Sequence, residues 1–291
     1  MKRTFVAALA LGGWVGVACT PSGPPTPKAT EVVAKFVPEV PRLEPNDERW
    51  SSAPELLTKL LLQDQAPPKL DQPGVETVRV RALRDDQWLS FRLEWSDPSV
   101  DELVAAARFG DMAAVQLPFL AGADVPDGAM GQVGRPVRIS LWRASHDHDH
   151  RTGKDQVSAL YPNAVVDHFP PDAAGTQKEA MALLYAPARA NRNPVASRRP
   201  DSSTEDLVAE GFGSLSPAAD QVSMGQGAHA DSAWRVVISR PLDSKDGEAL
   251  RPGGRTYVAF AVWQGADGNV GSRKMRSAWV PLTIEAKGAG R

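Results

Sequence analysis

The chain has 291 residues, of which 42% are hydrophobic and 23% are charged, and its formal net charge is -2. This composition is typical of a water-soluble globular protein with a sizeable core, built as one large domain or two small ones. The balanced charge gives no reason to expect a nucleic acid or an acidic surface as partner.

The first 18 residues have the layout of a signal peptide. Lys2 and Arg3 precede an apolar run from Phe5 to Val17 that closes on small residues. This run is shorter than the stretch of about 20 apolar residues that a transmembrane helix needs. We therefore expect the segment to be removed and the mature protein to leave the cytoplasm.

Cys19 is the only cysteine, so no disulfide can form within the chain. It stands where a lipoprotein signal peptide places its lipidated residue, although Gly16 occupies a position where leucine is usual. We expect Cys19 to carry a lipid anchor, with plain secretion as the alternative. Residues 19–35 are rich in proline and indicate a semi-rigid tether. The expected location is the periplasmic side of a membrane, or the periplasm itself.

From residue 75 the chain shows the period-two alternation that is typical of β-strands with one buried face. Residues 77–83 and 88–95 predict a β-hairpin around a turn at 84–87. Further strands are expected at residues 135–142, 234–240, 257–263 and 277–284.

Helical patterns are fewer, and we expect helices at residues 53–62, 100–108 and 204–211. The regular exchange of helix and strand that builds a parallel sheet is absent. We therefore predict a mainly β fold: an antiparallel β-sandwich with a few short helices and long loops, in one domain spanning residues 36–286.

Several familiar kinds of site are missing from the sequence. No Cys-x-x-Cys-His motif occurs, which excludes covalently attached c-type haem, and a single cysteine excludes an iron–sulfur cluster. Gly211-Phe212-Gly213 lacks the third glycine of a dinucleotide fingerprint, and neither a Walker loop nor a Gly-x-Ser-x-Gly elbow is present.

Three histidines alternate with two aspartates just after the predicted strand at 135–142. In a strand, this spacing would put all three rings on one face, where they could bind zinc or copper. We favour a solvated loop, because nothing nearby supplies a second shell of hydrogen bonds. The residues are His146, His148 and His150. The isolated His168 and His229 are expected to be structural.

Many segments, in order along the chain, resemble the haem-binding subunits of ethylbenzene dehydrogenase, dimethylsulfide dehydrogenase and chlorate reductase. The resemblance runs from about residue 40 to 285. It is carried by residues 44–47 (EPND), 94–98 (EWSDP), 113–118 (AAVQLP), 160–164 (LYPNA), 209–213 (AEGFG), 234–242 (WRVVISRPL) and 260–265 (FAVWQG), with Met130-Gly131, Arg273-Lys274 and Ser277-Ala278-Trp279.

The resemblance implies a non-covalent haem b in a pocket of the sandwich, with its iron held by a methionine and a lysine. By position these axial ligands are Met130 and Lys274, and Met112 is the weaker alternative for the sulfur. A lysine ligates only when neutral, so burial must lower its pKa from about 10.4. Four aromatic residues are candidate walls of the pocket, although core packing explains them equally well: Trp142, Phe260, Trp263 and Trp279.

With both axial positions filled by protein, the iron can only gain and lose an electron, so we expect an electron-transfer protein and not an enzyme. In the resembling family, the haem subunit works with a molybdopterin catalytic subunit of the DMSO reductase type and an iron–sulfur subunit. It exchanges electrons with a c-type cytochrome or quinone pathway. Two alternatives stay open: a haem-free sandwich lipoprotein that binds a ligand or protein, and a metal-handling lipoprotein that uses the three clustered histidines.

Overall fold

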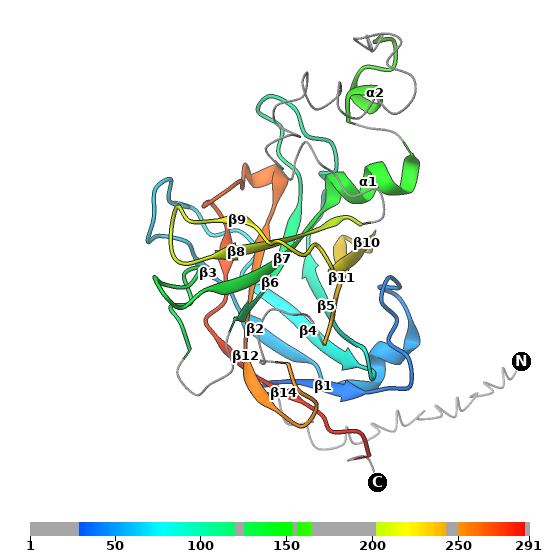
Figure 1. The fold of residues 1–291 in the computed structure, drawn as a ribbon. Coiled ribbons are helices and arrows are strands. Elements are labelled where there is room, and N and C mark those ends of the chain that lie inside the picture. Colours follow the sequence, from blue (N-terminus) through cyan, green and yellow to red (C-terminus); the bar gives the residue numbers. More distant parts are fainter. Residues whose placement is uncertain (1–28, 120–124, 154–155, 165–201, 243–249, 289–291) are drawn as a thin grey trace, which may run out of the picture.

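The computed structural model describes residues 29–119, 125–153, 156–164, 202–242 and 250–288. The predicted signal peptide, Cys19 and His168 lie outside these residues. Within them the chain is mainly β, as predicted (Figure 1). The strands are β1 (Val32–Phe36), β2 (Leu56–Lys59), β3 (Leu61–Leu62), β4 (Thr77–Arg84), β5 (Trp88–Ser96), β6 (Met112–Pro118), β7 (Val137–Arg143), β8 (Thr204–Ala209), β9 (Ser216–Pro217), β10 (Met224–Ala230), β11 (Ala233–Pro241), β12 (Arg255–Trp263), β13 (Met275–Arg276) and β14 (Val280–Ile284).

The helices of the described residues are short. They are η1 (Glu48–Ser52), α1 (Ala144–Thr152), α2 (Gln156–Leu160) and η2 (Gly265–Asp267). None of these helices is long and apolar enough to cross a membrane.

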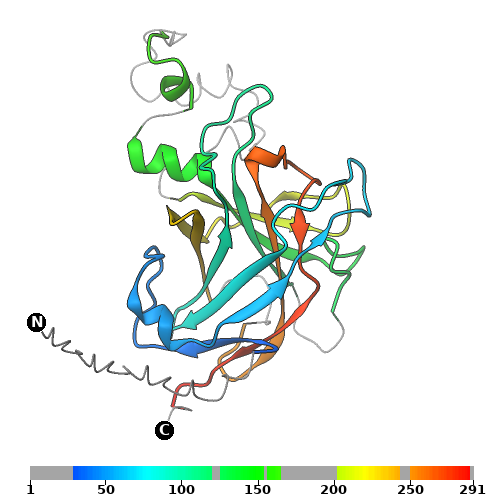
Figure 2. The same ribbon diagram turned by 180° about the vertical axis from the view of Figure 1, so that it is seen from behind.

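The strands form two layers that are joined through one long strand, β12. The order is β10-β11-β5-β4-β1-β14-β12-β6-β7-β8-β9. Residues 255–258 of β12 pair with β14 in the first layer, and residues 259–263 pair with β6 in the second. Figures 1 and 2 show the layers from opposite sides. Pairing is antiparallel except at β1, which runs parallel to both β14 and β4.

The main core lies between the two layers and is rich in aromatic side chains. Phe91 of β5 meets Phe260 of β12 edge to face, with ring centroids 6.3 Å apart. Trp142 of β7 meets Trp234 of β11 in the same way, at 5.1 Å. Such pairs stabilise the packing of the layers beyond the apolar area they bury. The alternate residues of β6, β7 and β12 therefore point away from this core.

All three predicted helices are wrong. Residues 53–62 form β2 and β3, residues 204–211 contain β8, and residues 100–108 hold only an isolated bridge between Ala105 and Arg108. In β8 the buried Asp206 carboxylate accepts hydrogen bonds from the Ser140 hydroxyl, at 2.9 Å, and from backbone of another loop. Such long-range partners override local helix propensity, and no window of sequence contains them.

Two other boundaries also differ from expectation. The histidine segment is neither a loop nor a strand, because residues 144–152 form helix α1, which ends at Gly153 in a left-handed conformation. Strand β1 begins at Val32, inside the segment 19–35 that was expected to be a tether, and it is hydrogen-bonded between β14 and β4. The end of the predicted tether is thus part of the sheet.

Candidate functional site

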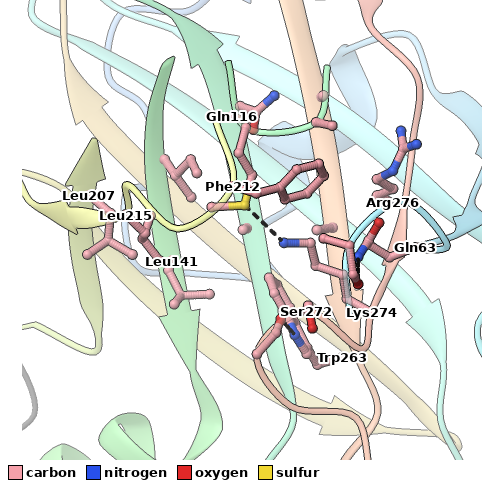
Figure 3. A pocket seen from close by; sticks show the side chains of 18 of the residues that line it. Gln63, Gln116, Leu141, Leu207, Phe212, Leu215, Trp263, Ser272, Lys274 and Arg276 are labelled. Atoms are coloured by element: carbon pink, nitrogen blue, oxygen red, sulfur yellow. Dashed lines mark hydrogen bonds between the residues drawn. The ribbon is translucent and has the colours of Figure 1, made fainter. Parts of the chain in front are cut away.

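A cavity of about 340 Å³ lies over the outer face of the second layer, on the side away from the main core. Its floor is made by alternate residues of four neighbouring strands, as period-two geometry requires. They are Met112, Ala114 and Gln116 of β6, Ile139 and Leu141 of β7, Leu207 of β8, and Ala259, Ala261 and Trp263 of β12. Figure 3 shows the cavity with its side chains.

Small side chains occupy the middle of this floor. Ala114 is paired with Ala261 across the two strands, and Ala259 is paired with Gln116. Directly opposed side chains in a sheet lie only about 5 Å apart, so these alanines leave a shallow, level space above the backbone. A flat apolar ligand fits such a floor better than a bulky one.

Met130 reaches the cavity from a loop that is fastened to the second layer. The Asp127 carboxylate accepts a hydrogen bond from the Ala129 backbone, at 2.8 Å, and the Gln116 side chain donates to the Gly128 carbonyl, at 3.0 Å. The Met130 carbonyl accepts from the Gly211 backbone at 2.8 Å. The loop thus holds Met130 over the alanine floor.

The backbone of Met130 has φ +72°, in the left-handed region that non-glycine residues seldom adopt. Such a conformation costs about 1 kcal/mol or more and persists only where surrounding contacts impose it. Gly131 follows at φ +80°, and a Cβ there would lie 2.9 Å from the Ala209 carbonyl oxygen. The two residues turn the chain sharply so that the methionine side chain points into the cavity.

Lys274 enters the cavity from the other side, just before the short strand β13. Its carbonyl accepts a hydrogen bond from the Gln63 backbone at 3.1 Å, and its ammonium group lies 5.1 Å from the centre of the Trp263 ring. Burial, and then the positive charge of Arg276, lower the pKa of the Lys274 amine from 10.5 to about 8. Near neutral pH this amine gives up its proton far more readily than a solvated lysine does.

The two predicted ligands meet, although 144 residues separate them in sequence. The nitrogen of Lys274 lies 3.8 Å from the sulfur of Met130, the contact drawn as a dashed line in Figure 3. Bonds from zinc to nitrogen and sulfur are about 2.1 and about 2.3 Å long, so a similar ion between the two atoms would need them about 4.4 Å apart. The two atoms would have to move apart by about 0.6 Å, and the methionine side chain has three rotatable bonds that allow such a movement. The donor set therefore fits an iron held from both sides.

The alternative methionine, Met112, also lines the cavity, but its sulfur faces Arg143 and not Lys274. Its sulfur accepts a hydrogen bond from the Arg143 guanidinium at 3.1 Å. Trp263 and Phe260 contribute to the cavity lining. Trp142 instead belongs to the main core, and Trp279 packs beside the cavity and donates to the Pro126 carbonyl at 2.8 Å.

Several cavity residues were not predicted from the sequence. Gln63 and Arg276 lie on the Lys274 side, and Phe212 and Leu215 form the rim beside Met130. In the sequence, residues 211–213 are an incomplete dinucleotide motif and part of the segment 209–213 that carries the family resemblance, and neither observation places Phe212 at a cavity. The alternation in residues 259–263, with alanine at every outward position but the last, was a usable signal for the floor.

The three clustered histidines do not line this cavity. In helix α1, successive residues are about 100° apart, so the period-two spacing of His146, His148 and His150 spreads the rings around the axis. Within the described part of the chain, no group of three or more histidine, cysteine or acidic side chains is placed to hold a metal ion. His229 contacts the Asp97 carbonyl at 2.8 Å and packs edge-on against Trp234, a structural role as predicted.

A family model described as ethylbenzene dehydrogenase matches residues 47–275. The match covers most of the chain and includes both Met130 and Lys274. The chain belongs to the ethylbenzene dehydrogenase family. The resemblance noted in the sequence is thereby confirmed, and the shared region of the family contains the whole floor of the cavity.

Three relatives illustrate this ethylbenzene dehydrogenase family. A Haloferax mediterranei protein, named as a respiratory nitrate reductase heme subunit, is 25% identical over 239 residues, which are 81% of this chain and 66% of the relative. The dimethylsulfide dehydrogenase subunit gamma of Rhodovulum sulfidophilum is 27% identical over 245 residues, 81% of this chain and 73% of its own. The chlorate reductase subunit gamma of Ideonella dechloratans is 35% identical over 69 residues, 23% and 29% of the two chains. The chain thus spans about two thirds of the Haloferax relative.

Among solved structures, a family 9 carbohydrate-binding module from Caldicellulosiruptor kristjanssonii in complex with cellotriose aligns over 89% of this chain and 95% of its own. The identity is 9% and the TM-score is 0.44. Nothing about function follows from this likeness.

Proposed function

We propose that this protein is a haem b electron-transfer subunit in which Met130 and Lys274 are the axial ligands of the iron. The observation that carries the proposal is the convergence of the Lys274 nitrogen and the Met130 sulfur, 3.8 Å apart, above a floor of alanines. A thioether and a neutral amine are both ligands that iron accepts, and the apolar lining of the cavity suits a porphyrin.

The haem would supply a one-electron couple, and the protein residues set the conditions for it. Lys274 binds iron only as the free amine, and burial favours this form. The Met130 thioether stabilises the reduced state and raises the potential. If Met130 and Lys274 both held the iron of a bound haem, no coordination site would be left for oxygen or a substrate. The protein therefore transfers electrons and does not itself transform a substrate.

The names of the relatives support a place in a larger oxidoreductase. One is named a heme subunit and two are named gamma subunits of multi-subunit enzymes. By analogy, the partners of this chain are a molybdopterin catalytic subunit of the DMSO reductase type and an iron–sulfur subunit. Electrons would be exchanged further with a c-type cytochrome or a quinone pathway.

The N-terminal segment supports an exported, membrane-tethered form of this subunit. The signal-peptide layout ends at Cys19, and the Pro-rich stretch that follows would hold the sandwich away from a lipid anchor. Mass spectrometry of the mature protein tests this part: a diacylglycerol adduct on Cys19 supports the anchor. A mature chain that keeps Met1 or lacks the adduct would show that the anchor is wrong.

The decisive test is the absorbance of the purified full-length protein, made in a host supplied with haem precursor. We expect a Soret band and a reduced spectrum of a six-coordinate low-spin haem b that organic solvent extracts. A folded protein that stays colourless would favour the alternative, a haem-free sandwich that binds another ligand or a protein. The circular dichroism of the same sample shows whether it is folded.

A further inference from the structure

The charge of the cavity is one-sided. Three cationic side chains line it, and no aspartate or glutamate does so within the described residues. Arg143 is neutralised by an ion pair with Glu205 at 2.9 Å, and Lys274 is turned toward Met130. The third cation of the lining, Arg276, has no carboxylate partner among the described residues.

Arg276 lies next to Lys274 on the same face of the chain. Lys274 comes just before strand β13 and Arg276 is its second residue. In extended chain, residues two apart lie on the same face, so both side chains point to the cavity, whereas Met275 between them enters the main core. The Nε atom of Arg276 is buried and has no hydrogen-bond partner, and no carboxylate in the described part of the chain pairs with this guanidinium.

The Nε atom of Arg276 has lost water without gaining a hydrogen bond, and the half-exposed guanidinium has no counter-charge beside it among the described residues, which is unfavourable. Arginine is also the side chain whose planar donors match a carboxylate in two parallel hydrogen bonds. These facts point to an anion that enters the cavity together with the ligand. A porphyrin of haem b carries such anions only at its edge, in two propionates.

We propose that Arg276 binds a propionate of the haem and so fixes the rotation of the porphyrin in the cavity. This inference rests on the proposed function, since it needs haem as the ligand. It assigns to the lining two separate roles: Met130 and Lys274 hold the iron, and Arg276 holds the charged edge. Gln63 and Ser277 are the polar neighbours of Arg276 in the lining.

The test compares two porphyrins that differ only at the propionates. Haemin and haemin dimethyl ester are titrated into the full-length apo-protein and followed by the Soret band. Arg276→Leu should weaken haemin binding by about 10- to 100-fold, the range expected for a lost charge-assisted hydrogen bond. It should leave binding of the ester nearly unchanged when the titrations are made above the pKa of Lys274, because loss of the Arg276 charge raises that pKa and weakens both porphyrins equally at lower pH. Arg276→Lys keeps the positive charge but not the two parallel donors of the guanidinium, so it should recover part of the lost affinity for haemin.

Arg273→Leu is the matched control. Arg273 also has a buried, unpartnered Nε and stacks over Phe109 at 5.9 Å, but it does not line the cavity. This variant should bind both porphyrins as the wild type does. A second measurement needs no variant. The wild type should bind haemin more tightly than the ester, and added salt should reduce this difference in affinity.

The outcomes separate the two claims. If the wild type binds neither porphyrin, the proposed function fails and this inference fails with it. If the wild type binds haemin no better than the ester, or if Arg276→Leu binds haemin as tightly as the wild type does, only the role of Arg276 is overturned. In that case inorganic anions such as chloride or phosphate, added to the apo-protein of wild type and variant, would show whether Arg276 instead holds a free ion.

Discussion

The two faces of strand β6 behave differently, although their residues alternate in one short stretch of chain. Ala113, Val115 and Leu117 point into the core between the layers. Met112, Ala114 and Gln116 point outward and help to line the cavity. The inward face is closed by large partners from the first layer, whereas the outward face keeps small residues at its centre. Stability and ligand binding are therefore assigned to alternate residues, and single substitutions should separate them.

Removing an axial ligand should have the largest effect. Loss of outer-shell partners of a metal costs about 10- to 100-fold in affinity, so loss of a direct ligand should cost at least about 100-fold. We expect Lys274→Ala and Met130→Ala each to lower haem retention or to shift the reduced spectrum. Unchanged spectra in both variants would contradict the ligand assignment.

A glycine at position 130 makes this test sharper. Because Met130 has φ +72°, Met130→Gly relieves a strained backbone and should fold at least as stably as the wild type. The haem should still be lost, because the sulfur is gone. Urea unfolding of the apo-protein, beside the Soret titration, distinguishes a missing ligand from a damaged fold.

Two neighbouring alanines provide the most direct comparison of the faces. Ala113→Leu overfills the core and should lower the free energy of unfolding by about 1–3 kcal/mol, while haem affinity is kept. Ala114→Leu extends into the cavity and should weaken haem binding by about tenfold or more, which is about 1.4 kcal/mol, with a smaller change in unfolding. Urea titrations and Soret titrations measure the two quantities. The reverse pattern would show that the faces have been assigned wrongly.

The pH dependence of haem binding follows from Lys274. The protonated amine cannot ligate, and its pKa in the folded protein is about 8. Above this pH the affinity should be level, and below it the affinity should fall by up to about tenfold for each pH unit, because protons compete with iron. Soret titrations between pH 6 and 9 check this. The variant Lys274→Met has no titrating ligand, so its haem affinity should not fall in this way as the pH is lowered.

The smallest effect is expected at the other methionine of the cavity. Met112→Leu conserves side-chain volume and should cost less than about 1.5 kcal/mol of stability. The reduced haem spectrum should be that of the wild type, because the Met112 sulfur faces Arg143 and not Lys274. A changed spectrum would move the ligand assignment from Met130 to Met112.

The strands were the predictable part of this fold, and the helices were not. The hairpin of β4 and β5 and the strands β7, β11 and β12 follow directly from alternation of polar and apolar residues. Residues 204–211 were misread as helix because the partners of Asp206 lie in β7 and in the loop at residues 222–223. The histidine segment was misread because a short polar helix has no apolar stripe to announce it.

The site was predictable only in part. Met130 and Lys274 came from resemblance to a family, since neither residue stands out from its neighbours by composition or spacing. Arg276 was missed, because an arginine near the end of a chain looks like a solvated residue until its surroundings are known. Its buried and unpartnered Nε atom is a property of the assembled cavity.

By itself, the sequence determined that the protein is built from strands with one buried face, because a period of two is written into each short segment. The absence of a covalent haem motif is also a local pattern, and so is the signal-peptide layout on which the prediction of export rests. Only the tertiary structure decided that the ends of two distant loops meet over the alanines of β6 and β12. That meeting depends on backbone pairing between strands far apart in sequence, which bring Met130 and Lys274 within 3.8 Å.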